Sequence, residues 1–213
     1  MWSKSGRIIQ TPEIFVVACR HRKPVITPFL QGMPFRVYMT PDYQLPPDFK
    51  LPRGHKNSIN MRNHMRCCYG HRDVMRMMGD EALIMEDDAV PSCGNWKEIC
   101  EGARRLLDEF AIVSLHTRMK TAKWTKRPFM DRTIWVRNPD GYGYGSLAYW
   151  IRRETAKHWI NRKFDGMPMD IGFYHIAALA NPTKTRQFCC VEPSPFRHVG
   201  RTLLYRDWDK TII

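Results

Sequence analysis

Hydrophobic residues occur along the chain in two spacings: short continuous or alternating runs, and longer stripes at helical spacing. The runs predict β-strands at Glu13–Cys19, Phe35–Met39, Ala82–Met85 and Ala111–Leu115. The stripes predict helices over residues 57–79, over Trp96–Phe110, from about Glu154 and from about Asp170. A further strand is expected between the glycine-rich turns near Gly141 and the helix near Glu154. This order indicates an α/β fold with a mixed, mostly parallel sheet flanked by helices.

Three consecutive acids, Glu86, Asp87 and Asp88, follow the apolar strand "ALIM". The chain is otherwise basic, with 34 Lys+Arg against 21 Asp+Glu and a formal net charge of +13. Adjacent like charges repel, so the cluster is costly unless a cation lies among them. Ligands of such sheets bind beyond the carboxyl ends of the strands, where these acids are expected to lie. A solvated turn, or acids complementing a helix dipole, is the structural alternative.

The composition narrows the classes of partner and compartment. A strongly positive chain attracts polyanions, which include nucleic acids, anionic membranes and phosphorylated glycans or nucleotides. The seven cysteines contain no CxxC pair, which argues against a zinc finger or a disulfide scaffold. The first residues lack the apolar core of a signal peptide, and no run is long enough to span a bilayer. We therefore expect a cytoplasmic protein, in a bacterial cell or a phage-infected host.

Five segments together resemble a known family: "RCCYGHRDVMRMM", "ALIMEDDAVP", "GYGYGSLAYWIRRETA", "MPMDIGFY" and "FRHVG". Their order is similar to that of the GT-A glycosyltransferases, in particular glycosyltransferase family twenty-five, the lipooligosaccharide and collagen galactosyltransferase type. The chain departs from the family at Gly70-His71, where Ser-His is usual, and at Ile151-Arg152, where Ile-Ser is usual. The resemblance implies a single GT-A domain over residues 1–213, with a nucleotide-sugar half at about 13–116 and an acceptor half at about 117–213.

The resemblance also implies a metal-dependent site. Asp88 would bind a divalent cation, with Glu86 and Asp87 completing the shell or holding the ribose, and His198 adding a ligand from the C-terminal loop. Carboxylate oxygens suit magnesium or manganese, and an imidazole ligand favours Mn²⁺ over Mg²⁺. The expected donor is a nucleotide sugar, with a UDP-sugar favoured. Candidate contacts to its nucleotide and diphosphate are Arg20, Arg22, Arg197 and Arg201.

Asp170 is the candidate general base. A carboxylate that activates the attacking hydroxyl from the face opposite the leaving group predicts inversion at the anomeric carbon. Asp170 also stands where the N-cap of the following helix is expected, and Asp is a favoured cap. The two roles are compatible.

The residues expected to contact the acceptor lie in a basic stretch, residues 117–133, in which aromatic residues are interleaved. Basic side chains with aromatics among them suit a phosphate backbone and an exposed base. The candidate acceptor contacts are Lys120, Lys123, Trp124, Lys126 and Arg127. They favour DNA as the acceptor, with a hydroxymethylated pyrimidine flipped out of the duplex, as in phage-type DNA glycosyltransferases. A mobile acceptor loop with solvated charge, or an enzyme of phosphorylated lipooligosaccharide at a membrane surface, is the alternative.

The sequence is also compatible with two functions other than glycosyl transfer. A non-enzymatic nucleic-acid-binding module would carry the same positive charge, with structural carboxylates. A metal-dependent nuclease would also use paired acids, because two-metal phosphodiester cleavage needs them.

Overall fold

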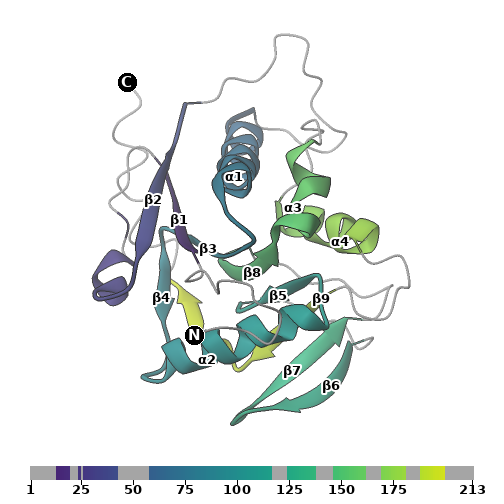
Figure 1. Ribbon diagram of the computed structural model, residues 1–213. Coiled ribbons are helices and arrows are strands. Elements are labelled where there is room, and N and C mark those ends of the chain that lie inside the picture. The colour runs from purple at the N-terminus through teal and green to yellow at the C-terminus, as the bar shows by residue number, and fades with distance from the viewer. Residues whose placement is uncertain are drawn as a thin grey trace.

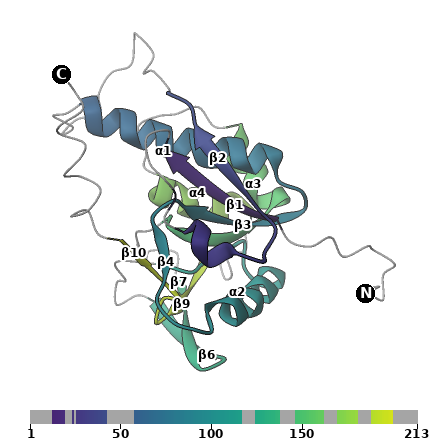
Figure 2. The ribbon, with the colours of Figure 1, turned by 90° about the vertical axis from the view of Figure 1, so that its left-hand side faces the viewer.

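An eight-stranded mixed sheet with helices on both faces organises the protein (Figures 1 and 2). The computed structural model describes residues 13–19, 24, 26–42, 58–116, 124–137, 146–161, 169–180 and 188–199. The strand order is β2-β1-β3-β8-β5-β9-β7-β6. The α/β class with helices flanking a mixed sheet is therefore confirmed.

The strands of this sheet are β1 (Glu13–Cys19), β2 (Phe35–Thr40), β3 (Glu81–Glu86), β5 (Ile112–Ser114), β6 (Trp124–Phe129), β7 (Arg132–Arg137), β8 (Ala148–Arg152) and β9 (Phe188–Glu192). A second, two-stranded sheet pairs β4 (Ala89–Pro91) with β10 (Phe196–His198) in antiparallel fashion. The helices are α1 (Ser58–Met77), α2 (Trp96–Arg105), α3 (Arg153–Ile160) and α4 (Met169–Ala180), with 3₁₀ turns at Thr27–Leu30 and Leu106–Asp108. Most of the predicted elements recur within a few residues of their expected bounds.

The sheet is less parallel than its helix–strand order suggested. β1 pairs in parallel with β2 and β3, and β5 pairs in parallel with β9. β8 lies between β3 and β5 and runs antiparallel to both. Since β3 and β5 each oppose β8, they point the same way. The carboxyl ends of β1, β3 and β5 therefore meet at one edge of the sheet.

Alternate residues of the central strands enter two different cores. Ile14 and Val16 of β1 pack on the face covered by α2, whereas Phe15 and Val17 pack on the face covered by α1, α3 and α4. This is the period-two pattern of a strand buried on both faces. The views agree, since α2 lies on one side of the sheet and the three other helices lie on the opposite side (Figures 1 and 2).

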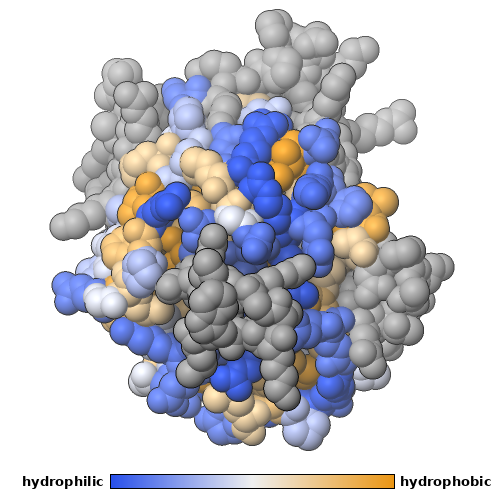
Figure 3. Space-filling model, viewed as in Figure 1, coloured by the Kyte–Doolittle hydropathy of each residue, from blue (hydrophilic) through white to orange (hydrophobic). Residues whose placement is uncertain are grey.

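The visible described surface is mostly hydrophilic and carries hydrophobic residues in small separate patches (Figure 3). Among the described helices, none combines the length and the apolar character needed to cross a membrane.

Part of the basic stretch expected to be a loop is instead a β-hairpin at the edge of the sheet. β6 and β7 pair in antiparallel fashion around the turn at Met130 and Asp131, and β7 continues the sheet from β9. Met130 has a φ of 53°, the left-handed conformation that a tight turn demands. The charged residues of β6 hide its strand pattern, because four consecutive residues of this edge strand, Thr125–Pro128, are exposed.

The close packing of α1 against β1 and β2 can be tested at Gly70. A Cβ added there would lie 2.7 Å from Thr40 Oγ1 and 2.9 Å from Val17 Cγ1. In an open helix, Gly→Ala stabilises by up to about 1 kcal/mol. Here we expect Gly70→Ala to destabilise by about 1–3 kcal/mol, because the contact resembles overpacking. Urea unfolding measures the difference.

Gly94→Ala is the matched control, since an added Cβ there meets nothing within 4 Å. Its free energy of unfolding should change by less than about 0.5 kcal/mol. A Gly70→Ala variant as stable as the parent would show that α1 does not approach β1 and β2 this closely.

Candidate metal centre at the end of β3

The backbone of the acidic turn is held by three neighbouring segments. The Glu86 N–H donates to the Leu147 carbonyl at 2.8 Å, and the Asp87 N–H donates to the Val17 carbonyl at 3.0 Å. The Asp88 carbonyl accepts a hydrogen bond from the Val199 N–H at 3.1 Å. Because these bonds come from the segments of β8, β1 and β10, the acids have fixed positions where the chain leaves the sheet.

Glu86, Asp88 and His198 converge at this point. One ligand atom from each lies within 4.8 Å of the others. His198 is directly after Arg197 in β10, whose pairing with β4 places it opposite Ala89. The three side chains that the sequence analysis assigned to the metal are thus neighbours, although His198 is more than a hundred residues away from the acids.

The spacing of two of these side chains suits a divalent cation. His198 Nε2 lies 3.0 Å from Asp88 Oδ2. Adjacent ligands of an octahedral ion with bonds of about 2.1 Å are about 3.0 Å apart. The same distance suits a hydrogen-bonded pair, so an ion can replace the shared proton with little movement. The Asp88 side chain is 5% exposed and His198 is 23% exposed, which leaves the imidazole side open to solvent.

Glu86 is held as a carboxylate by its neighbours. Burial raises its pKa, but His71, the hydroxyl of Ser146 and the charge of His198 together outweigh burial and lower the pKa to about 2. The Ser146 hydroxyl donates a hydrogen bond to Glu86 Oε1. His71 Nε2 lies 3.6 Å from the same oxygen. Glu86 is therefore ionised at neutral pH, the state in which a carboxylate binds a cation.

His71 and Ser146 are residues of this site that the sequence analysis did not select. His71 stands in the Gly70-His71 pair of the family resemblance, and this was the available signal for it. Ser146 follows a glycine-rich stretch and carries no signal of its own. Its role depends on the antiparallel position of β8 beside β3, which hydrophobic patterns do not reveal.

The structure describes only some of the other residues that were predicted to contact the nucleotide sugar or to act as the general base. Asp87 is buried, with 4% exposure. Arg197 is exposed and adjoins His198 on β10, so the two side chains point to opposite faces of that strand. Outside the described residues are Arg20, Arg22 and Arg201. Asp170 is the second residue of α4, but its side chain also lies outside the description.

The predicted acceptor residues that the structure describes lie on β6. The indole of Trp124 is 5% exposed and packs edge-on against Phe188, with ring centroids 5.9 Å apart. A base cannot stack on an indole buried in this way, so the structure corrects that assignment. Lys126 lies over the Trp135 ring at 4.5 Å, and Arg127 pairs with Glu109. Lys120 and Lys123 are outside the described residues.

Comparisons with known proteins add a likeness of overall structure. No protein-family model matches the sequence, and no curated protein matches it. Among solved structures, the crystal structure of A197 from STIV aligns with a TM-score of 0.46 and 12% sequence identity. The alignment covers 89% of this chain and 86% of that chain.

The ionisation of Glu86 predicts a dependence of stability on pH. A carboxylate whose pKa is lowered by folding stabilises the folded state above its ordinary pKa of 4.5, and this stabilisation is lost as the pH falls through about 2. Glu86→Gln should therefore be destabilising at neutral pH, with a penalty that shrinks as the pH is lowered across this window. Urea unfolding at a series of pH values, with a chelator present, measures it.

Glu98→Gln, on the exposed face of α2, is the control and should follow the parent at every pH. A Glu86→Gln penalty that stays constant or grows in acid would contradict the low pKa of Glu86.

Proposed function

We propose that the protein is a divalent-cation-dependent glycosyltransferase that moves a sugar from a nucleotide sugar to a hydroxyl acceptor. The observation that carries the proposal is the convergence of Glu86, Asp88 and His198 at the carboxyl edge of the sheet. Ligands of open α/β sheets bind at this edge. The resemblance of the five sequence segments to glycosyltransferase family twenty-five supports the reaction type.

In this proposal the two carboxylates and the imidazole hold the cation, and Mn²⁺ is preferred over Mg²⁺ because one ligand is nitrogen. The bound cation supplies the positive charge that neutralises a departing diphosphate. Glu86 contributes a full negative charge at neutral pH because its pKa is about 2. Asp87 and the arginines at positions 20, 22 and 201 are proposed to contact a nucleotide sugar, with a UDP-sugar favoured. Arg197 lies on the opposite face of β10 from His198 and would reach the nucleotide sugar only away from the cation.

Asp170 is the proposed general base. It follows Met169 at the start of α4, and a carboxylate there would take the proton of the acceptor hydroxyl, giving inversion. The donor is assigned to residues 13–116 and the acceptor to residues 117–213. His198 then joins the two halves, since it comes from the second and completes the cation site of the first.

The proposed acceptor is a hydroxymethylated pyrimidine in DNA. The support is electrostatic: the net charge is +13, and Lys126 and Arg127 are exposed on the edge strand β6. A chain of this charge binds a phosphate backbone through counterion release. Transfer to a phosphorylated surface glycan, such as lipooligosaccharide, uses the same charge and is the alternative outcome of the test.

The cation site is tested by Asp88→Asn. This variant should lose tight Mn²⁺ binding, followed through the electron paramagnetic resonance of the free ion. It should also lower release of nucleoside diphosphate from a panel of nucleotide sugars by at least about 100-fold. Asp80→Asn, at an exposed carboxylate beyond α1, is the matched control and should retain both properties. Manganese-dependent turnover that survives Asp88→Asn would refute the assignment of the site.

The acceptor is tested by offering hydroxymethylated DNA, unmodified DNA and a phosphorylated glycan, each with the nucleotide-sugar panel. We expect a sugar on hydroxymethylated DNA alone, detected by mass spectrometry of the nucleosides. The combined Lys126→Ala and Arg127→Ala variant should flatten the salt dependence of duplex affinity by about 0.9 per lost phosphate contact. Lys157→Ala, at an exposed position of α3, should leave the salt dependence unchanged. Sugar on the glycan and none on DNA would reject the DNA acceptor while keeping the transferase.

A further inference from the structure

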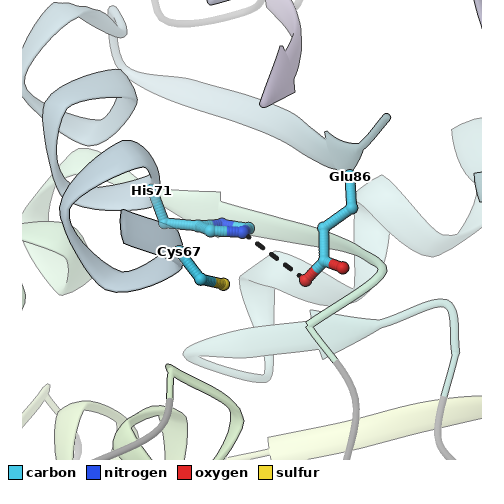
Figure 4. A group of neighbouring side chains, drawn as sticks. All are labelled: Cys67, His71 and Glu86. Atoms are coloured by element: carbon cyan, nitrogen blue, oxygen red, sulfur yellow. Dashed lines mark ion pairs between the residues drawn. The ribbon is translucent and has the colours of Figure 1, made fainter. Parts of the chain in front are cut away.

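A second cluster of potential ligands faces the other side of Glu86. Cys67 and His71 are four residues apart on α1, so their side chains lie on one face of the helix, one turn apart. Both point toward the Glu86 carboxylate at the end of β3 (Figure 4). One ligand atom from each of Cys67, His71 and Glu86 lies within 4.8 Å of the others. A sulfur, a nitrogen and an oxygen therefore surround one small volume.

The buried imidazole of His71, with one ring nitrogen that forms no hydrogen bond, points to a ligand at this position. The residue is 0% exposed, and its Nε2 has no hydrogen-bond partner, although it faces Glu86 Oε1 at 3.6 Å. Glu86 is its ion-pair partner, but 3.6 Å is longer than a hydrogen bond, and a buried nitrogen left without a hydrogen bond is poorly satisfied. A cation between the nitrogen and the carboxylate oxygen would satisfy both atoms.

The opposite nitrogen of the ring has a suitable partner. His71 Nδ1 lies 2.7 Å from the hydroxyl oxygen of Tyr149. Burial raises the pKa of Tyr149 well above its ordinary value, so the phenol is neutral and its oxygen can accept a hydrogen bond. Cation binding requires the tautomer in which Nδ1–H donates to Tyr149, because the Nε2 lone pair is then directed at the cation beside Glu86. Histidines that bind metals are usually oriented by such a bond from the second ring nitrogen.

The ligand set selects the class of cation. Thiolate, imidazole and carboxylate are the ligands of zinc, whose bonds to nitrogen and oxygen are about 2.0–2.1 Å. At a tetrahedral angle these bonds separate the two ligand atoms by about 3.4 Å, close to the 3.6 Å between His71 and Glu86. Magnesium and manganese prefer oxygen-rich sites and are disfavoured by sulfur.

We propose that Cys67, His71 and Glu86 form a second divalent-cation site that is selective for zinc. Zinc binding forms the bond to the Cys67 sulfur and releases the thiol proton to solvent. Three protein ligands leave a fourth position for water. The site adjoins the cluster of Glu86, Asp88 and His198, and the two oxygens of Glu86 can serve one ion each. This site goes beyond the proposed transfer reaction and does not require it.

Cobalt substitution in the full-length chain tests the site, because a thiolate bound to Co²⁺ gives a near-ultraviolet charge-transfer band. We expect the band in the parent protein, with zinc displacing the cobalt, and its loss in Cys67→Ser. Cys93→Ser, at another half-buried cysteine, should keep the band. Tyr149→Phe, which removes the hydrogen-bond partner of His71, should weaken zinc affinity by roughly 10–100-fold in competition with a chelator.

Asp88→Asn separates this proposal from the proposed function. It should lose Mn²⁺ binding but keep the thiolate–cobalt band, because Asp88 belongs to the other cluster. Absence of the band in the parent protein would overturn the zinc site, as would a band that survives Cys67→Ser. Circular dichroism of each variant confirms that a lost band is not a lost fold.

Discussion

The backbone hydrogen bonds that hold residues 86–88 are the constraint on which the rest of the site depends. Without the bonds to Leu147, Val17 and Val199, three adjacent acids would repel one another and separate into solvent. With them, Glu86 and Asp88 are presented at a fixed edge of the sheet. The small β4–β10 sheet starts directly after this turn and brings His198 back to it. The fold thus concentrates negative charge at one point of a basic protein.

Glu86 is the electrostatic centre of this arrangement. His71 and His198 approach its carboxylate from different elements, α1 and β10, and both lower its pKa. Each histidine is also paired with a second group, Tyr149 for His71 and Asp88 for His198. A carboxylate between two histidines either shares protons with them or shares cations. The thiol of Cys67 on the His71 side makes the two candidate cation positions chemically different.

Much of the fold was predictable because its central strands are buried on both faces. Runs such as Ala82–Met85 are apolar throughout, and α1 begins and ends near its predicted bounds. The β6–β7 hairpin was missed because edge strands carry exposed charges, which read as a loop. The burial of Trp124 was not predicted for the same reason, because only a strand beside β7 places its indole against Phe188.

The neighbourhood of Glu86, Asp88 and His198 could be predicted from the sequence, through the resemblance of the segments that contain them, and their binding of a metal stays a prediction. The roles of His71 and Ser146 could not be predicted, because they arise from contacts across the sheet. Ser146 reaches Glu86 by virtue of the position of β8 next to β3. Cys67 becomes a candidate ligand because α1 presents it beside His71. Such relations depend on tertiary packing that a linear pattern does not encode.

The proposed cation site requires Glu86, Asp88 and His198 to bind one divalent cation at the end of β3. Anomalous diffraction at the manganese absorption edge, from crystals grown with Mn²⁺, tests it most directly. We expect an anomalous peak within bonding distance of Asp88, His198 and Glu86. A well-ordered crystal in which these three side chains surround no peak, or in which manganese occupies a different position, would contradict it.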